Sequence, residues 1–454
     1  MKKVWLVVAL TALGGLAANT FADVQNIRLS GDIRIRGYYM VNVGGDAVED
    51  QLKGADSFIS QRTRVCVEAD LEDHVLAVVT LKAEGLWGQD NDAGDSSGAG
   101  TGGATGNDAI NRRWEVGVTE AYLQLNEVFY SAATLKLGRQ YLNYGRGLIF
   151  SSVEQEYNFD AARLVLDYYP FTLDLVYAAL LENSVFGAPS TTHPNDLHVL
   201  FANARYEMTD SLLKNVEFYF GYLINSSPVS TSSRVPPSAG SASPFIAGLR
   251  ADMNLTEGLN TWAEAAYEWG NDGTAGNDTI SAWLVNLGGR FSKKDWNYAP
   301  SFNANYTFAS GGGSGGSKAF RPWFNYVDGN NGYLFQPMLS NIHIFNLGAT
   351  VKPAENLSAS LQAYYYLAAD KTPGLPGAGL KGDPNVDFGG LGFSPSGSSR
   401  ELGWEVDAIL GYDYSKDVRA QLVYAVFIPE NDFHKPYPSD SMAHLVRGEV
   451  NVKF

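Results

Sequence analysis

The chain is dominated by segments in which apolar and polar residues alternate strictly. We count about eighteen of them, the first over 25–43 and the last over 442–454. The last one, HLVRGEVNVKF, places Val450, Val452 and Phe454 on one parity and charged or amide residues on the other. Because successive side chains point to opposite faces of a strand, each segment predicts a β-strand with one apolar and one polar face.

The connections between these segments fall into two classes that alternate along the chain. YPF, NLTEG, KPAEN and SKD are tight, whereas QDNDAGDSSGAGTGGATGND and DKTPGLPGAGLKGDPNVDFGG are long. A soluble sandwich has no reason to sort its connections in this way, but an outer-membrane barrel has short periplasmic turns and long extracellular loops. The sequence therefore predicts an all-β fold, an antiparallel up-and-down transmembrane barrel of about 18 strands, formed by a single domain over 23–454.

The first residues, MKKVWLVVALTALGGLAANTFAD, have the layout of a secretory signal peptide. Two lysines precede an apolar stretch from Val4 to about Ala18, which is short for a membrane-spanning helix, and small residues follow. We predict a signal peptide over 1–22 with cleavage after Ala22. The single cysteine, Cys66, excludes an internal disulfide. We expect export to the bacterial outer membrane, with outer-membrane lipid as a partner.

The polar parities predict a charged lumen. A barrel of about eighteen strands leaves an aqueous channel, and an ionised side chain on the lipid face costs about 2–4 kcal/mol, so charged residues are expected to point inward. The formal net charge is −16, but much of the acid lies in connections such as QDNDAGDS. The predicted pore-lining residues are Arg34, Arg36, Arg62, Arg64, Arg139, Arg163, Arg250, Arg419 and Arg447.

The expected acidic partners in the pore are Glu68, Glu120, Asp167, Glu405 and Asp407, with Glu264 on a similar parity. One alternative is that each arginine only braces the wall against these acids. The cluster on the first two segments favours an excess of positive potential, because only Asp32 and Glu68 lie close to it in sequence. Arg139 shares the parity of Leu135 and Leu137, so only a bulge or a position beyond the lipid band would turn it inward.

Several stretches resemble the outer-membrane alginate export porins and their relatives with an alginate export domain. LGRQYLNYGRGLIF followed by FDAARL is similar to the family's central pattern, and SNIHIFNLGATVKP and ELGWEVDAILGYDYSKDVRAQLVYAVFIPENDF are similar to later blocks. The chain departs from the pattern at Leu148, where the family has an arginine, and at Trp404, where it has a histidine. The central pattern corresponds here to Gly138, Arg139, Gln140, Tyr144, Gly145, Phe159, Asp160 and Arg163.

The resemblance implies an eighteen-stranded barrel with an arginine-lined, anion-selective pore. Uronate polymers are strings of carboxylates, which guanidinium groups bind in bidentate geometry. We therefore expect passive passage of anionic polysaccharide or related anionic carbohydrates, with periplasmic secretion proteins as further partners. The C-terminal strand resembles those of bacterial barrel proteins, which implies that Phe454 belongs to the signal read by the barrel assembly machinery.

Two other functions stay open. A general diffusion porin for small solutes is the main alternative, and an outer-membrane enzyme is a remote one, because the chain has no HExxH and no GxxxxGK[ST] motif. We expect no enzymatic activity, no cofactor and no nucleic-acid partner. The acidic loop DNDAGD offers oxygen ligands of the kind that calcium prefers, although such a loop is ordinarily just solvated.

Overall fold

The computed structural model describes residues 26–42, 55–71, 74–88, 113–151, 158–181, 197–209, 211–225, 243–271, 279–312, 318–321, 323–324, 331–337, 339–371, 400–430 and 442–454. The predicted signal peptide and the acidic loop DNDAGD lie outside these residues. Among the described residues, no helix has the length and apolar character needed to cross a membrane.

Within the described residues, eighteen antiparallel strands form one sheet, as the alternation predicts. The strands are β1 (Asn26–Val41), β2 (Ala55–Asp70), β3 (Val75–Leu86), β4 (Arg113–Asn126), β5 (Ala133–Gln140), β6 (Phe159–Tyr168), β7 (Phe171–Leu181), β8 (Leu197–Glu207), β9 (Leu213–Asn225), β10 (Ser243–Thr256), β11 (Leu259–Asn271), β12 (Thr279–Ser292), β13 (Ser301–Ala309), β14 (Ile342–Ala354), β15 (Leu357–Ala368), β16 (Glu401–Asp413), β17 (Val418–Pro429) and β18 (Ala443–Lys453).

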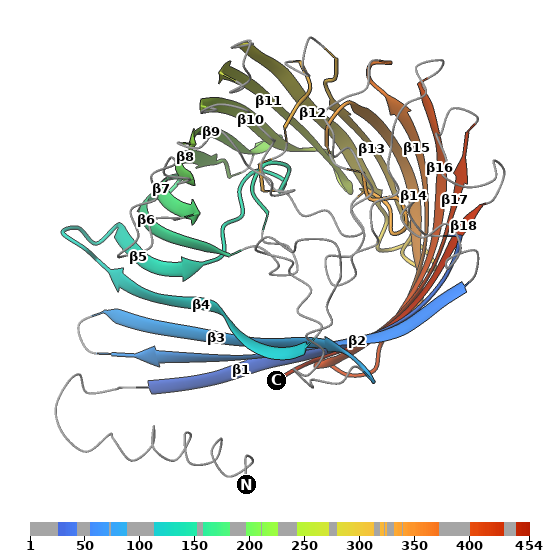
Figure 1. The fold of residues 1–454 in the computed structure, drawn as a ribbon, viewed down its shortest axis with the longest axis horizontal. Helices are drawn as coiled ribbons and strands as arrows, with labels where there is room; N and C mark the ends of the chain where they lie inside the picture. The colour runs from blue at the N-terminus through green and yellow to red at the C-terminus, as the bar shows by residue number, and fades with distance from the viewer. Residues whose placement is uncertain are drawn as a thin grey trace, which may run out of the picture.

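The sheet closes on itself, because β1 pairs with β18 as well as with β2. The closing register runs from Asp32 opposite Lys453 to Val41 opposite His444. The last residue takes part, since the N–H of Gly31 donates to the carbonyl of Phe454 at 2.8 Å and the N–H of Phe454 donates back at 3.0 Å. Figure 1 shows the strands following one another around a ring in chain order. Closure leaves the wall without an edge strand.

The two ends of the barrel differ in their connections. At one end, here called the short-turn end, the strands are joined by 71–74, 127–132, 169–170, 208–212, 257–258, 293–300, 355–356 and 414–417. At the other, the long-loop end, the connections are mostly longer, and the longest are 87–112, 310–341 and 369–400. The predicted alternation of tight and long connections is therefore present.

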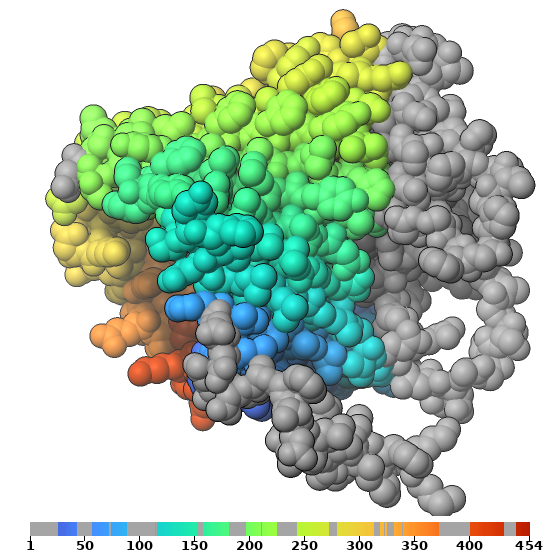
Figure 2. Space-filling model, turned by 90° about the vertical axis from the view of Figure 1, so that its left-hand side faces the viewer, coloured from blue at the N-terminus to red at the C-terminus, as the bar shows by residue number. Residues whose placement is uncertain are grey.

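Side chains alternate between the interior and the outer surface. On β1, Asp32, Arg34 and Arg36 are buried, while the residues between them are more exposed. On β7, Leu175 and Tyr177 are exposed on the outer face and Asp174 is buried. The cyan to green surface in Figure 2 is the outer side of β4–β9. Many exposed large hydrophobic side chains belong to this outer face of the wall, as a surface in contact with lipid requires.

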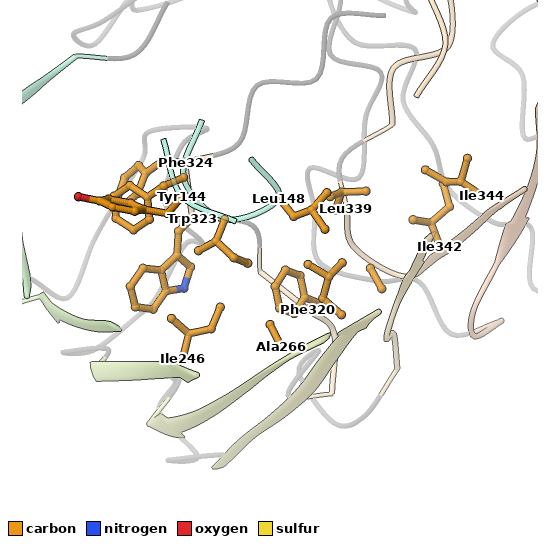
Figure 3. Close-up of a cluster of buried hydrophobic side chains, with 14 of the residues drawn as sticks. Tyr144, Leu148, Ile246, Ala266, Phe320, Trp323, Phe324, Leu339, Ile342 and Ile344 are labelled. Atoms are coloured by element: carbon orange, nitrogen blue, oxygen red, sulfur yellow. The ribbon is translucent and has the colours of Figure 1, made fainter. Parts of the chain in front are cut away.

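The hydrophobic core lies inside the barrel and is built from inward-facing residues of the wall together with two inward-folded connections. The first inner segment is residues 141–151, between β5 and β6, and the second inner segment is the described part of 318–341, between β13 and β14. Figure 3 shows their apolar side chains meeting those of the wall, with Phe320 near Ala266 of β11. The interior is thus partly filled by chain rather than uniformly open.

Candidate functional site

The two inner segments are joined to each other by backbone hydrogen bonds. Phe150 and Phe324 form a parallel bridge, in which the N–H of Ser151 donates to the carbonyl of Phe324 at 2.8 Å. The N–H of Phe324 in turn donates to the carbonyl of Ile149 at 2.9 Å. The ring of Phe150 packs on Phe201 of β8, with 4.7 Å between centroids. Segments far apart in sequence therefore form one structural unit inside the wall.

Carboxylates of the wall hold the tip of the first inner segment. The N–H of Gly145 donates to Glu217 Oε1 of β9 at 2.9 Å, and the N–H of Arg146 donates to Glu264 Oε2 of β11 at 2.8 Å. Gly145 has φ +59°, and a Cβ there would come within 2.5 Å of Glu264 Oε1, so this position requires glycine. Glu264 was expected to face an arginine, and it instead accepts a backbone N–H.

Tyr144 fixes the same segment to β7. Its hydroxyl donates to Asp174 Oδ2 at 2.9 Å, and Arg163 Nη2 of β6 lies 2.6 Å from the same oxygen. Burial raises the pKa of the Tyr144 hydroxyl well above its ordinary value, so the group stays a neutral donor to the carboxylate. Arg163 points inward as predicted, and it is braced by an acid that the sequence prediction did not assign to it.

Two further carboxylates hold the second inner segment. Glu268 of β11 accepts the N–H of Arg321 and the indole Nε1–H of Trp323, both at 2.8 Å. Glu405 of β16 accepts three successive backbone N–H groups at 2.7–2.8 Å, from Tyr333, Leu334 and Phe335. The prediction that Glu405 pairs with a pore arginine is wrong, because a fully buried carboxylate here satisfies the N–H groups of a chain that no strand pairs. Asp407 lies beside Glu405 on the buried face and within electrostatic range of Arg447.

The predicted arginines of β1 and β2 lie together on the interior face. Arg64 Nε donates to Asp32 Oδ2 at 2.6 Å, and Arg62 Nη2 approaches Asp32 Oδ1 at 3.5 Å. Their neighbours pair with acids on adjacent strands. Arg34 lies 3.6 Å from Glu84 of β3, and Arg36 Nε lies 2.5 Å from Glu449 Oε2 of β18.

This side of the wall carries more cations than acids. The basic sector is defined here as the inward-facing charged residues of β18, β1, β2 and β3 between the rims. Lys82 joins it, 3.2 Å from Glu84, and the guanidinium of Arg447 lies 4.7 Å from the ring centroid of Tyr333 in the second inner segment. Its described cations are Arg34, Arg36, Arg62, Arg64, Lys82 and Arg447, and its described acids are Asp32, Glu84 and Glu449.

The cations of the basic sector differ in accessibility. Arg34, Arg36, Arg62 and Arg447 are buried, whereas the side chain of Arg64 is 14% exposed and that of Lys82 18%. The deeper arginines are therefore braced within the structure, as the alternative for single arginines supposed. Arg64 and Lys82 are the most accessible cations of the sector, and the acid Glu449 is exposed to a similar extent.

A second basic group surrounds the tip of the first inner segment. Arg250 of β10 donates from Nη1 to the carbonyl of Gly145 at 2.5 Å, and its Nη2 lies 2.6 Å from Asp252. The guanidinium of Arg146 stacks 4.0 Å from the ring centroid of Trp262 on β11. Neither Arg146 nor Trp262 was among the predicted site residues. The sequence Gly145–Arg146–Gly147 could have indicated this site, because two glycines with positive φ form a tight turn around Arg146 and its side chain reaches the wall.

Arg139 is placed outside the barrel. It pairs in register with Ala121 and Asp160, which lie on the exposed parity, and it forms a bidentate ion pair with Asp160 at 2.8 Å for both contacts. No bulge turns it inward. The expectation that Arg139 lines the pore is therefore wrong, and the simple parity of Leu135 and Leu137 holds.

The remaining predicted charges lie mostly at the short-turn end. Arg419 is on the inward parity but at the rim, half exposed and 2.7 Å from Asp413. Glu68 pairs with Arg28 at 2.9 Å rather than with the arginines of β2, and Asp167 accepts from the Thr172 hydroxyl at 3.2 Å. Glu120 of β4 is inward and accepts from the Thr80 hydroxyl at 2.8 Å. In the part of the chain that the structure describes, no group of three or more His, Cys, Asp and Glu side chains is arranged to hold a metal ion.

Solved structures with the same fold include the outer membrane proteins OprD and OpdK and the protein OpdO, all of Pseudomonas aeruginosa. OprD is 12% identical with a TM-score of 0.56, covering 95% of this chain and 96% of its own. OpdO is 12% identical with a TM-score of 0.55, covering 95% and 98%. OpdK, solved with vanillate, is 13% identical with a TM-score of 0.54, covering 94% and 98%. No curated protein matches the chain.

The family described as alginate export matches residues 27–446, which is nearly the whole chain. Together with the closed barrel of eighteen strands, this match indicates an outer-membrane channel. The chain belongs to the alginate export family.

Proposed function

We propose that the protein is a passive outer-membrane channel for anionic polysaccharide or related anionic carbohydrates. The observation that carries this proposal is the segregation of charge inside the barrel. Cations outnumber acids in the basic sector, while Glu217, Glu264, Glu268 and Glu405 on other strands are occupied by N–H groups of the inner segments. Permeant ions on this side of the lumen then meet an excess of positive over negative charge.

The chemistry of such a cargo suits this interior. A carboxylate on each sugar offers a guanidinium a bidentate partner, and Arg64 and Lys82 are accessible enough to exchange their acidic partners for a passing carboxylate. Binding at each point is weak, because the cation already has a partner in the wall. Several weak sites allow a polymer to step along, whereas one tight site would hold it.

A second candidate is a channel for small anionic solutes alone. The inner segments favour it, because they fill part of the lumen with packed side chains such as Phe320, Trp323 and Phe324. A constricted lumen admits a monomer more easily than a polymer. Both candidates share anion preference and differ in whether uronate oligomers enter.

Sidedness and biogenesis belong to the same proposal. Short turns in outer-membrane barrels lie in the periplasm, so the short-turn end faces the periplasm and the long-loop end faces outside. Residues 1–22 direct export as a cleaved signal peptide, and the barrel assembly machinery reads the C-terminal strand. Periplasmic secretion proteins deliver the polymer.

Planar-bilayer recording of the full mature chain tests the function. The reversal potential under a salt gradient should show anion preference, and uronate oligomers added to one side should block the small-ion current at a concentration at which neutral oligomers of equal length block less. A cation-selective channel would contradict both candidates. Anion preference without any block by uronate oligomers would favour the small-solute channel.

A further inference from the structure

The interior face of β12–β15 carries a strip of five uncharged amide side chains, beside which Arg290 of β12 lies in register with Asn303. The amide strip is defined here as Asn286 of β12, Asn303 and Asn305 of β13, Asn346 of β14 and Gln362 of β15. It shares the inward parity of Ile342 and Ile344, which belong to the interior core, whereas Phe345 and Leu347 are exposed on the outer face. The strip therefore lines the lumen beside the charged groups already described.

Its members form two hydrogen-bonded groups on neighbouring strands, one of Asn303, Asn346 and Gln362 and the other of Asn286 and Asn305. Asn303 Nδ2 donates to Asn346 Oδ1 at 2.8 Å and to Gln362 Oε1 at 3.1 Å, and Asn346 Nδ2 reaches Gln362 Oε1 at 3.2 Å. Asn286 Nδ2 donates to Asn305 Oδ1 at 2.9 Å. Toward the short-turn end the strip is followed by a hydroxyl pair, in which Thr350 and Ser360 lie 2.8 Å apart.

The strip begins at the second basic group. The indole Nε1–H of Trp262 donates to Asn286 Oδ1 at 2.9 Å, and the ring of the same Trp262 stacks with the guanidinium of Arg146. A chain passing the tip of the first inner segment thus meets a guanidinium, an aromatic ring and then amides. A uronate sugar offers a matching group to each of these: its carboxylate to the guanidinium, its apolar ring face to the aromatic ring, and its hydroxyls to the amides.

A glycine makes the strip flat. Gly348 of β14 pairs with Asn303 on one side and Gln362 on the other, and a Cβ at Gly348 would overlap the Gln362 amide. Gln362 therefore lies across β14 along the wall, where it reaches Asn303 two strands away. Its amide is only partly buried, as is that of Asn303, so one side of each faces the lumen. Because Gly348 has no side chain, the Gln362 amide can pack against the backbone of β14.

We propose that the amide strip binds the hydroxyl groups of a carbohydrate chain in transit. This inference rests on the proposed passage of carbohydrate and names the groups that recognise its uncharged part. Amides both donate and accept, as sugar hydroxyls do, so wall–wall hydrogen bonds exchange for wall–sugar bonds without leaving a group unpaired. Such exchange is weak and repeated along the strip, which is what transport requires.

The test is block of small-ion current by a neutral glucose hexamer and by a uronate hexamer, compared in the full mature chain. Asn303→Ala combined with Gln362→Ala should raise the concentration of neutral hexamer needed for half block about tenfold, corresponding to the loss of two ordinary hydrogen bonds. The reversal potential should not change, because no charge is altered. Gly348→Ala, which displaces Gln362 without removing it, should weaken the same block.

Asn215→Ala is the matched control. Asn215 of β9 faces inward outside the strip, and like Asn303 of β13 it is the third residue of its strand from the short-turn end. Equal block in the double variant and in this control would overturn the inference. If the double variant does not fold, Gln362→Ala alone carries the test. Neutral hexamer that never blocks the native channel, while uronate hexamer does, would overturn the strip and leave the proposed function standing. Block by the neutral hexamer in a channel without anion preference would support the strip and contradict the proposed anion channel.

Discussion

Reversing the charge of Arg64 should reduce anion preference by an amount that the structure allows us to estimate. The guanidinium is the partly exposed end of the basic sector, and its partner Asp32 remains when it is removed. At about 6 Å from a permeant ion in water, one unit of charge contributes about 0.7 kcal/mol, and screening over about 8 Å lowers this to about 0.3 kcal/mol. That energy favours anions and disfavours cations, so the permeability ratio changes about threefold per unit of charge.

Arg64→Gln should therefore lower the anion-to-cation permeability ratio about threefold, and Arg64→Glu about tenfold, both measured from reversal potentials in planar bilayers. Arg139→Gln is the matched control, since Arg139 carries the same charge on the outer face. Higher salt should shrink the effect because screening strengthens. A ratio that is the same for both Arg64 variants and the control, in channels of normal yield, would refute the electrostatic role and leave Arg64 as a wall brace.

Three further predictions concern seating, assembly and topology. Glu405→Ala removes the acceptor of three backbone N–H groups of the second inner segment. The free energy of unfolding in lipid vesicles should therefore fall by about 3 kcal/mol, and the noise of the single-channel current should rise. Unchanged noise would mean that other contacts hold the second inner segment in place. Phe454→Ala should lower outer-membrane yield in cells while refolded protein conducts normally, and normal yield would argue against an assembly role. Cysteine labelling of intact cells should reach Lys318→Cys, an exposed position in the 310–341 connection, and not Lys416→Cys, and the opposite pattern would invert the proposed sidedness.

The wall was predictable because its signal is local. The last alternating segment was placed at 442–454 and β18 spans Ala443–Lys453, since period-two alternation is a property of neighbouring residues. Orientation followed from the same parity, which explains why Arg34 and Arg62 face inward and why Arg139, with Leu137 on its parity, does not. Strand ends were less secure, and β5 stops at Gln140 because the chain then turns into the lumen.

The partners inside the barrel were not predictable, because barrel closure and strand register decide them. Arg36 meets Glu449 from the other end of the chain, through the pairing of β1 with β18. The inner segments escaped notice for a different reason. Their apolar residues follow no period, and the positive φ of Gly145 and Gly147 is invisible in a pattern of hydrophobicity. Consequently Glu264 and Glu405 were read as partners of side chains rather than of backbone.

The seating of the inner segments also sets an order in time. Residues 141–151 precede β6 in the chain, yet their backbone partner Phe324 follows β13, and their carboxylate seats are on β9 and β11. The first segment therefore waits without its final partners until most of the wall exists. A wall that forms before the two inner segments dock would hold buried carboxylates and backbone N–H groups without their partners, which makes this docking an aggregation-prone step of assembly.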